Sequence, residues 1–366
     1  MPPMIPRVRT DSRRRQFAAA AALCAAVLFP TQAQSPGSFA HRIASLSEPG
    51  GYFDTDNLIS NEGSYVAVLP ELAQRKVRGG AYIGVGPDQN FTYIAATRPS
   101  IAFIVDIRRD NLLLHLLFKA IFELAPTRLG YLELVFGRTP SPETAGWKSA
   151  SVERILSHVE SRHPSDAEIA SVRTKVDAVV ARLGVSLSDD DRRTIDRFHR
   201  RFVQAGTGLR FQSLGRAPRP YYPTYRDLLV ARDSSGRGSF LATEDDYQFV
   251  KQLHRRDLIV PVVGDVSGAK ALRAIGQLLE ERNERLMALY ISNVEFYLFR
   301  DDRFQRYLEN LGRIPHHANA VIIRSVFGLY AYNSSNDYSS SHVQSYDELL
   351  DRAKRGSIVY YRDLLK

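Results

Sequence analysis

The stretch that decides the fold is residues 80–110, which read GAYIGVGPDQNFTYIAATRPSIAFIVDIRRD. A short apolar run ends in the letters GVG, a polar segment follows, and a second apolar run ends at Asp106. Glycines at a strand-to-helix turn let a ligand approach the backbone, and the helix N-terminus beyond them favours polar or negative groups. Asp106 lies 20 positions after Gly86, where a carboxylate can accept hydrogen bonds from both hydroxyls of a ribose. The stretch predicts a nucleoside-binding turn, and the alternative is a structural turn in which Asp106 is a cap or pairs with Arg108.

The loop after the turn argues against a dinucleotide. The dinucleotide fingerprint G-x-G-x-x-G requires a glycine three residues after Gly86, and that position is Gln89. A pyrophosphate therefore has little reason to prefer this loop. NAD is disfavoured, and a nicotinamide-dependent oxidoreductase is only the third candidate function.

Further apolar runs of strand length follow along the chain. They are rich in Ile, Val and Tyr and mostly continuous, as in parallel strands that are buried on both faces. The runs cover 81–85, 101–107, 258–263, 286–291, 320–326 and 358–361. Helical patterns separate them, among them the nearly all-apolar segment 110–125. We therefore expect an α/β fold with a doubly wound, mostly parallel, Rossmann-like sheet and right-handed crossovers.

No strand pattern occurs between about residues 139 and 222. Charged amphipathic helical patterns fill this region, including one that starts with the capping box Ser165-x-x-Glu168. We expect a helical insertion between the second and third strands, with its charged faces in solvent. The expected boundaries are a linker over 34–47, the first part of the α/β domain over 48–138, the insertion over 139–222 and the second part over 223–366.

Residues 1–33 have the pattern of an export signal. Several arginines precede the apolar run FAAAAALCAAVLF, which is too short to span a bilayer as a helix, and Ala33 offers a small residue for cleavage. Arg14 and Arg15 also resemble a twin-arginine signal, so the Sec and twin-arginine routes both stay open. A membrane anchor or a misassigned start codon are the alternatives. We expect an exported, periplasmic protein with no transmembrane helix in the processed chain.

Processing would change both the charge and the cysteine content. The 366-residue chain has a formal net charge of +9, and residues 1–33 hold five Arg and one Asp, so the processed chain would carry 44 − 39 = +5. This mild excess, spread over a large chain, is weak support for nucleic-acid binding. The only cysteine, Cys24, would also be removed. The processed chain would then have no disulfide, cysteine nucleophile or thiolate metal site.

The turn, together with the blocks VDIRRDN, GDVSG and ISNVEFY, resembles a class I S-adenosylmethionine-dependent methyltransferase. More specifically, it resembles an uncharacterised bacterial family with a methyltransferase-like fold. The resemblance covers roughly residues 48–137 and 240–366. It implies that Gly84 and Gly86 face the methionine part of S-adenosylmethionine, where Asn90 and Asp88 could supply hydrogen bonds in place of the family's usual groups. Asp106 would hold the ribose.

The same resemblance assigns roles to residues that follow the third and fourth strands. Asp265 would lie at the adenine edge, and Asn293 and Glu295 would be the catalytic positions that orient the methyl acceptor. A strand-end turn acid is the alternative for Asp265, and a helix N-terminal acid is the alternative for Glu295. The chain departs from the superfamily at Tyr82, where an acid is usual, and at Asp88, where a glycine is usual.

Two functions follow from these patterns. The first is S-adenosylmethionine-dependent methyl transfer by in-line displacement, in which positioning supplies most of the rate. The second is a non-catalytic exported ligand-binding or interaction protein that retains the fold, which export favours because the methyl donor is made in the cytoplasm and consumed at each turnover. Either way the expected partner is a small nucleoside-type ligand. No metal site is expected, since the adjacent His316 and His317 rarely face one ion. The loop 215–227 is either a proline-fixed connection or a lid that contacts an anionic or aromatic ligand.

Overall fold

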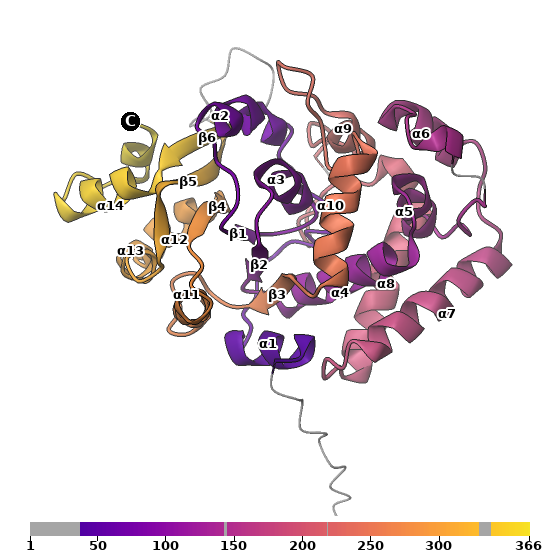
Figure 1. Ribbon diagram of the computed structural model, residues 1–366, viewed down its shortest axis with the longest axis horizontal. Coiled ribbons are helices and arrows are strands. Elements are labelled where there is room, and N and C mark those ends of the chain that lie inside the picture. The colour runs from indigo at the N-terminus through magenta and orange to yellow at the C-terminus, as the bar shows by residue number, and fades with distance from the viewer. Residues whose placement is uncertain (1–36, 143–144, 218, 329–337) are drawn as a thin grey trace, which may run out of the picture. The chain divides into compact units, whose positions relative to one another are not determined.

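A mostly parallel sheet with the strand order β3-β2-β1-β4-β5-β6 organises the chain (Figure 1). Its strands are β1 Ala81–Val85, β2 Ile101–Asp106, β3 Ile259–Val263, β4 Leu286–Ser292, β5 His316–Phe327 and β6 Ser339–Ser345. β1 to β5 run parallel, and β6 pairs antiparallel with β5. The computed structural model describes residues 37–142, 145–217, 219–328 and 338–366, so the predicted export signal lies outside the described residues.

Helices cover both faces of the sheet. Figure 1 shows α3 (Gln89–Thr97), α4 (Arg109–Leu124) and α10 (Glu244–Arg255) on one side, with α11 (Ala271–Glu281), α12 (Val294–Arg300) and α13 (Phe304–Leu311) on the other. α4 is buried continuously from Asn111 to Phe122, because the sheet lies on one of its sides and the helices of the insertion lie on the other. The predicted α/β fold with a mostly parallel sheet is confirmed.

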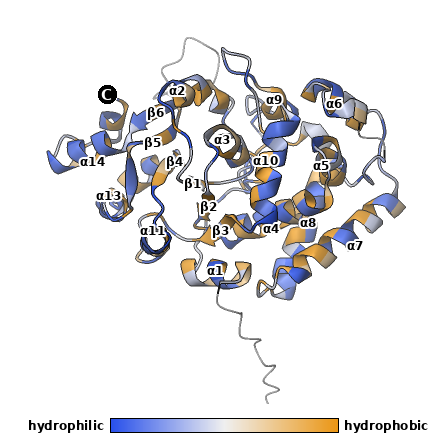
Figure 2. Ribbon diagram, viewed as in Figure 1, coloured by the Kyte–Doolittle hydropathy of each residue, from blue (hydrophilic) through white to orange (hydrophobic). Residues whose placement is uncertain are grey.

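A group of helices lies between β2 and β3, in the region for which the sequence predicts an insertion over 139–222, and its first and last helices lie outside those bounds. We call this group the insertion; its helices are α5 Arg128–Val135, η2 Ala145–Trp147, α6 Val152–Glu160, α7 Asp166–Arg182, α8 Asp189–Ala205, η3 Gly206–Gly208 and α9 Tyr225–Val230. The predicted capping box of Ser165 and Glu168 starts α7. α7 and α8 bury an apolar stripe against α4, and Figure 2 shows hydrophilic and hydrophobic residues alternating along both helices.

The segment expected as a linker contains α1 (Phe39–Leu46) instead. Its first turn is capped by the Ser38 hydroxyl, and Phe39, Ile43 and Leu46 form a buried stripe at helical spacing. This stripe packs against β3 and α11. The linker prediction is therefore wrong for these residues, because the stripe is too short to stand out among its polar neighbours.

The C-terminal region also differs from the prediction. Residues 358–361 do not form a strand, since Tyr361 starts the short helix η5 (Tyr361–Leu365). The polar sequence SSSHVQS forms the edge strand β6 in their place. The remaining helices are η1 Tyr65–Val68, α2 Leu69–Gln74 and α14 Tyr346–Lys354. Among all the described residues, no helix is both long and apolar enough to cross a bilayer.

Candidate functional site

The sheet order reverses between β1 and β4, the strands that start its two halves. In open α/β sheets, ligands bind outside the carboxyl ends of the strands at such a point. The predicted site residues gather along this carboxyl edge. Gly84 and Gly86 lie at the end of β1, Asp106 ends β2, Asp265 follows β3, and Asn293 follows β4.

A segment of the chain's own N-terminal part, residues 48–64, runs along this edge; we call it the strap. The backbone N–H of Glu48 donates to the carbonyl of Val263 at the end of β3, at 2.9 Å. The N–H of Gly51 donates to the carbonyl of Ile107 just after β2, at 2.7 Å. The strap thus uses carbonyl groups that the ends of β2 and β3 leave open.

The insertion holds the strap from its outer side. Thr55 pairs with Ser213 in an isolated antiparallel bridge. The N–H of Asp56 donates to the carbonyl of Gln212 at 3.0 Å, and the N–H of Gln212 donates back to the Asp56 carboxylate at 3.1 Å. The strap therefore lies between the sheet edge and the loop that leads to α9, with backbone hydrogen bonds on both sides.

Asp106, the predicted ribose ligand, accepts three hydrogen bonds from Arg108. The backbone N–H and Nε of Arg108 donate to Oδ1 at 2.9 and 3.2 Å, and Nη2 donates to Oδ2 at 3.0 Å. The remaining guanidinium nitrogen, Nη1, donates to the carbonyl of Thr55 in the strap at 3.0 Å. The two side chains are only 11% and 8% exposed. This is the arrangement of the structural alternative, in which Asp106 pairs with Arg108.

The space beside Gly84 is filled by the chain itself. A Cβ added at Gly84 would lie 1.9 Å from Oδ1 of Asn90 and 2.6 Å from the hydroxyl of Tyr82. That hydroxyl donates to Asn90 Oδ1 at 2.8 Å, while Asn90 Nδ2 donates to the carbonyls of Val85 and Pro87 at 2.9 and 2.7 Å. Asn90 is therefore buried, and its hydrogen bonds stabilise the turn. Both Asn90 and Gly84 serve the turn's own packing.

Gly86 turns the chain with a φ of +83°, which favours glycine. Its carbonyl accepts a hydrogen bond of 2.9 Å from Nε2 of His115 in α4, and burial lowers the pKa of His115 to about 4. An added Cβ would lie 3.5 Å from Nδ2 of Asn57 in the strap. Asn57 itself has a φ of 45°. The backbone face that a ligand would approach at Gly86 is thus covered by the strap.

A buried carboxylate lies in the crevice between β1 and β4, where the strand order reverses. Glu62, at the far end of the strap, is 1% exposed, and burial raises its pKa. The hydroxyl of Tyr290 in β4 donates to it at 2.7 Å, and the hydroxyls of Ser292 and Ser325 at the ends of β4 and β5 also donate to it. The amide of Gln89 donates in turn to Tyr290. Ser292 has a φ of 53°, a costly conformation for serine that this network holds in place.

The residues expected near adenine and the methyl acceptor also have internal partners. Asp265 Oδ1 accepts from the N–H and hydroxyl of Ser267 at 2.8 and 2.7 Å, and Oδ2 accepts from Nη1 of Arg303 at 2.7 Å. This is the turn acid of the structural alternative. Asn293 is partly exposed at the N-cap of α12, and its side chain does not cap the helix.

Glu295 forms a buried ion pair with Arg324. Arg324 of β5 donates from Nε and Nη2 to its two oxygens at 2.7 and 3.2 Å, and both side chains are at most 2% exposed. The hydroxyl of Tyr307 lies 3.4 Å from the same carboxylate. The pair ties α12 and α13 to the sheet. The two predicted catalytic residues thus differ in exposure, since Asn293 is partly exposed and Glu295 is enclosed.

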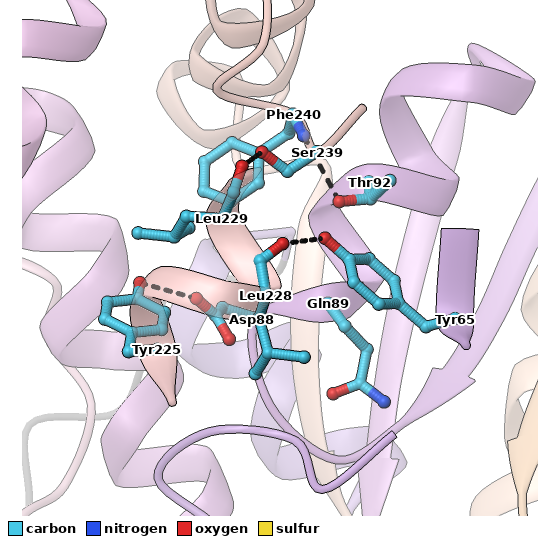
Figure 3. Close-up of a pocket in the computed structure, with 9 residues that line it drawn as sticks. All are labelled: Tyr65, Asp88, Gln89, Thr92, Tyr225, Leu228, Leu229, Ser239 and Phe240. Atoms are coloured by element: carbon cyan, nitrogen blue, oxygen red, sulfur yellow. Dashed lines mark hydrogen bonds between the residues drawn. The ribbon is translucent and has the colours of Figure 1, made fainter. Parts of the chain in front are cut away.

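A small cavity lies beside the turn (Figure 3). Its volume of about 10 Å³ is room for about one water molecule. Its lining residues are Tyr65, Asp88, Gln89, Thr92, Tyr225, Leu228, Leu229, Ser239 and Phe240. Tyr65 donates to the carbonyl of Leu228 at 2.7 Å, and Tyr225 donates to Asp88 Oδ2 at 2.7 Å. Burial raises the pKa of Asp88 to about 6. A cavity of this size cannot hold a nucleoside.

A larger cleft of about 670 Å³ lies elsewhere, where α4, α7 and α10 end beside α1. Two buried lysines in this cleft donate hydrogen bonds to carbonyl groups in the last turns of helices. Lys119 of α4 donates to the carbonyl of His254 in α10, and Lys251 of α10 donates to the carbonyl of Phe122 in α4 at 2.7 Å. Burial lowers the pKa of Lys251 to about 8. Each lysine caps the other helix, where the helix dipole favours a cation.

The fold and the edge together define an α/β protein whose carboxyl-edge crevice is occupied by its own strap. The chain belongs to a family described as a domain of unknown function, DUF7790, whose model matches residues 58–363. The matched region includes the turn, the Glu62 end of the strap, the insertion and the rest of the sheet. Among curated proteins, none matches the sequence.

Proposed function

We propose that this protein is a non-catalytic, exported ligand-binding or interaction protein that retains a Rossmann-like, methyltransferase-type fold. The strand order and its reversal at β1 and β4 support the fold assignment. The observation that carries the functional proposal is the ion pair of Asp106 with Arg108, which also donates to the strap.

The energetics of Asp106 favour this proposal over cofactor binding. A ribose that contacts both oxygens of Asp106 would compete with the guanidinium of Arg108 for the carboxylate. Removing one partner of a buried ion pair costs about 3–5 kcal/mol, so displacing the guanidinium carries a penalty of this order. The exchange costs a few kcal/mol, and about 1.4 kcal/mol already weakens binding tenfold. The strap must also leave Gly86 before a ligand reaches the turn.

Methyl transfer is the second candidate, and the gathering of Gly86, Asp106, Asp265 and Asn293 along one sheet edge favours it. In that case S-adenosylmethionine would bind after the strap moved away from the strand ends. Asn293 would remain available to orient an acceptor. Glu295 would not, because its carboxylate is committed to Arg324.

Isothermal titration calorimetry and thermal shift with S-adenosylmethionine, S-adenosylhomocysteine and NAD test the proposal. We expect no saturable binding of any of the three. Micromolar binding of the first two, abolished in Asp106→Ala and retained in the neighbouring Arg109→Ala, would establish the methyltransferase candidate instead. Binding of NAD alone would favour the oxidoreductase.

Export needs its own test, since the predicted signal lies outside the described residues. Cell fractionation of the tagged full-length chain is expected to place the protein in the periplasm. Retention in the cytoplasm would remove export from the proposal. Replacing Arg14 and Arg15 with lysine distinguishes the routes, because only twin-arginine export would be blocked.

A further inference from the structure

The large cleft at the ends of α4, α7 and α10 lies at the opposite end of the sheet from the carboxyl edge. One of its walls is Asp257, which comes just before β3 begins at Ile259. Its volume of about 670 Å³ is within the range of small-molecule sites, about 300–1,000 Å³. Six of its nine described lining residues are charged: Lys119, Glu123, Arg182, Lys251, Arg255 and Asp257. The cleft is thus large enough for a small molecule, and its walls are mostly charged.

Two of the four cations in the cleft are paired with its two carboxylates. Nζ of Lys119 lies 2.6 Å from Oδ1 of Asp257. Nη2 of Arg182 lies 2.7 Å from Oε1 of Glu123. These pairs use both acidic side chains of the cleft, so the other two cations have no carboxylate within it to pair with.

The two remaining cations, Lys251 and Arg255, lie one helical turn apart on α10. Like charges at this spacing repel each other. Lys251 is only 7% exposed, and its Nζ donates to the backbone carbonyls of Phe122 and Ala125. Within the described part of the chain, the guanidinium of Arg255 forms no hydrogen bond or ion pair. A buried lysine is rarely found without a partner of opposite charge, so this pair of cations calls for an anion.

The electrostatics of the cleft agree with this reading. Burial and the charge of Arg255 lower the pKa of Lys251 to about 8, while Glu123 acts in the opposite direction. Four cations and two carboxylates leave a formal excess of 4 − 2 = +2. The three helix ends at the cleft offset at most about half a charge each. A positive excess therefore remains, and a bound anion would reduce it.

The free donors of the cleft suit a carboxylate or a phosphate. A guanidinium such as that of Arg255 donates two parallel hydrogen bonds to either group. The ammonium of Lys251 has three N–H donors, and the two carbonyls leave one of them for a ligand. Leu183 and Phe39 supply the apolar part of the described lining. The ring of Phe39 already lies 4.6 Å from Nζ of Lys119, so the rest of the ligand should be polar as well.

We propose that this cleft binds a small polar organic anion, a carboxylate or a phosphate ester, whose charged group contacts Lys251 and Arg255. The inference rests on the proposed ligand-binding role of the protein, because it names the ligand class and its site. The two fail separately, however. Binding of S-adenosylmethionine that depends on Asp106 would overturn the proposed function and leave the cleft unchanged, whereas a cleft that binds no anion overturns this inference alone.

Isothermal titration calorimetry of the protein purified from full-length expression tests the cleft, at a fixed low ionic strength because salt screens such contacts. The probes are glycerol 3-phosphate and succinate, with uncharged glycerol as the match for the first. We expect one saturable site for at least one anion, with a dissociation constant below about 1 mM, and no binding of glycerol. Binding of only one anion would show which charged group the cleft takes.

Two neighbouring arginines provide a matched pair of variants. Arg255→Gln should raise the dissociation constant at least about tenfold, because it removes charge-assisted hydrogen bonds to the anion. Arg256→Gln removes the same charge from the next residue, which does not line the cleft, and should change it less than about twofold. Both side chains are exposed, so neither change should lower the melting temperature.

Acetylation by acetic anhydride, read by mass spectrometry, locates the bound anion. A bound anion should slow the acetylation of Lys251, because it covers the amine and favours the unreactive ammonium form. The exposed Lys175 of α7 should react at the same rate with and without the anion.

Three outcomes overturn the inference. The first is that neither anion binds saturably. The second is an equal loss of binding in the two arginine variants, which would indicate general attraction by the charge of the protein. The third is binding that leaves the acetylation of Lys251 unchanged, which would place the anion elsewhere.

Discussion

Asp88→Asn should make the protein more stable at neutral pH. Asp88 is buried, and desolvation raises its pKa from 3.8 to about 6. A carboxyl whose pKa is raised by folding is more costly to ionise in the folded state than in the unfolded state. With about 1.36 kcal/mol for each pKa unit, the ionised side chain costs about 3 kcal/mol above pH 6. Asparagine removes the charge and can still accept the hydrogen bond from Tyr225.

The sign of the pH dependence follows from the same shift. Between about pH 4 and pH 6 the folded state binds more protons at Asp88 than the unfolded state. The free energy of unfolding of the wild type should therefore fall as the pH rises through this window. Glu62, whose pKa burial also raises, acts in the same direction in both proteins. The contribution of Asp88 is thus the difference between wild type and variant.

Urea unfolding followed by circular dichroism at pH 4, 5, 6 and 7.5 measures this difference. We expect Asp88→Asn to exceed the wild type by about 2–3 kcal/mol at pH 7.5, with the gap shrinking toward pH 4. Asp110→Asn is the control, because Asp110 is an exposed acid in the first turn of α4. A variant less stable than the wild type at pH 7.5, or a gap that does not change with pH, would refute the reasoning.

Three further substitutions test the packing of the edge, each measured by urea unfolding. Arg108→Ala should cost about 3–5 kcal/mol, because it leaves a buried carboxylate without its counter-charge. Arg193→Ala is the control and should cost under about 1 kcal/mol, since both members of its pair with Asp190 are exposed. Glu295→Gln should cost about 3–5 kcal/mol, since it leaves a buried guanidinium without its counter-charge; a loss under about 1 kcal/mol would contradict the buried pair. Gly84→Ala should cost about 1–3 kcal/mol, because its Cβ would overlap a buried amide oxygen, whereas Gly208→Ala has open space and should be nearly neutral.

The sequence predicts the sheet well because its central strands are buried on both faces. Every residue of β1 and β3 is buried, so the apolar runs mark these strands directly. β6 has no apolar run that would predict it, because its side chains are mostly polar and its pairing with β5 depends on backbone hydrogen bonds alone. The apolar run at 358–361 misleads for the opposite reason, because Tyr361 packs on the rings of α12 without joining the sheet.

Only the part of the candidate site that depends on strand ends and on sequence neighbours can be predicted from the sequence. Strand ends place Gly86, Asp106 and Asp265 at one edge, and the pairing of Asp106 with Arg108 is a local contact of neighbours in sequence. What fills the crevice is not local. Glu62 is 228 residues away from its partner Tyr290, and no spacing pattern relates the two. Its burial depends on the path of the strap, which only the fold determines.

The closed edge bears on where this molecule can bind a partner. A ligand in the crevice would have to displace donors from Asp106 or Glu62, or backbone hydrogen bonds of the strap. A partner on the outer surface breaks none of these, and it can bury exposed aromatic side chains such as Tyr52 and Tyr360, which water already contacts. The outer surface therefore offers the lower free-energy route to binding.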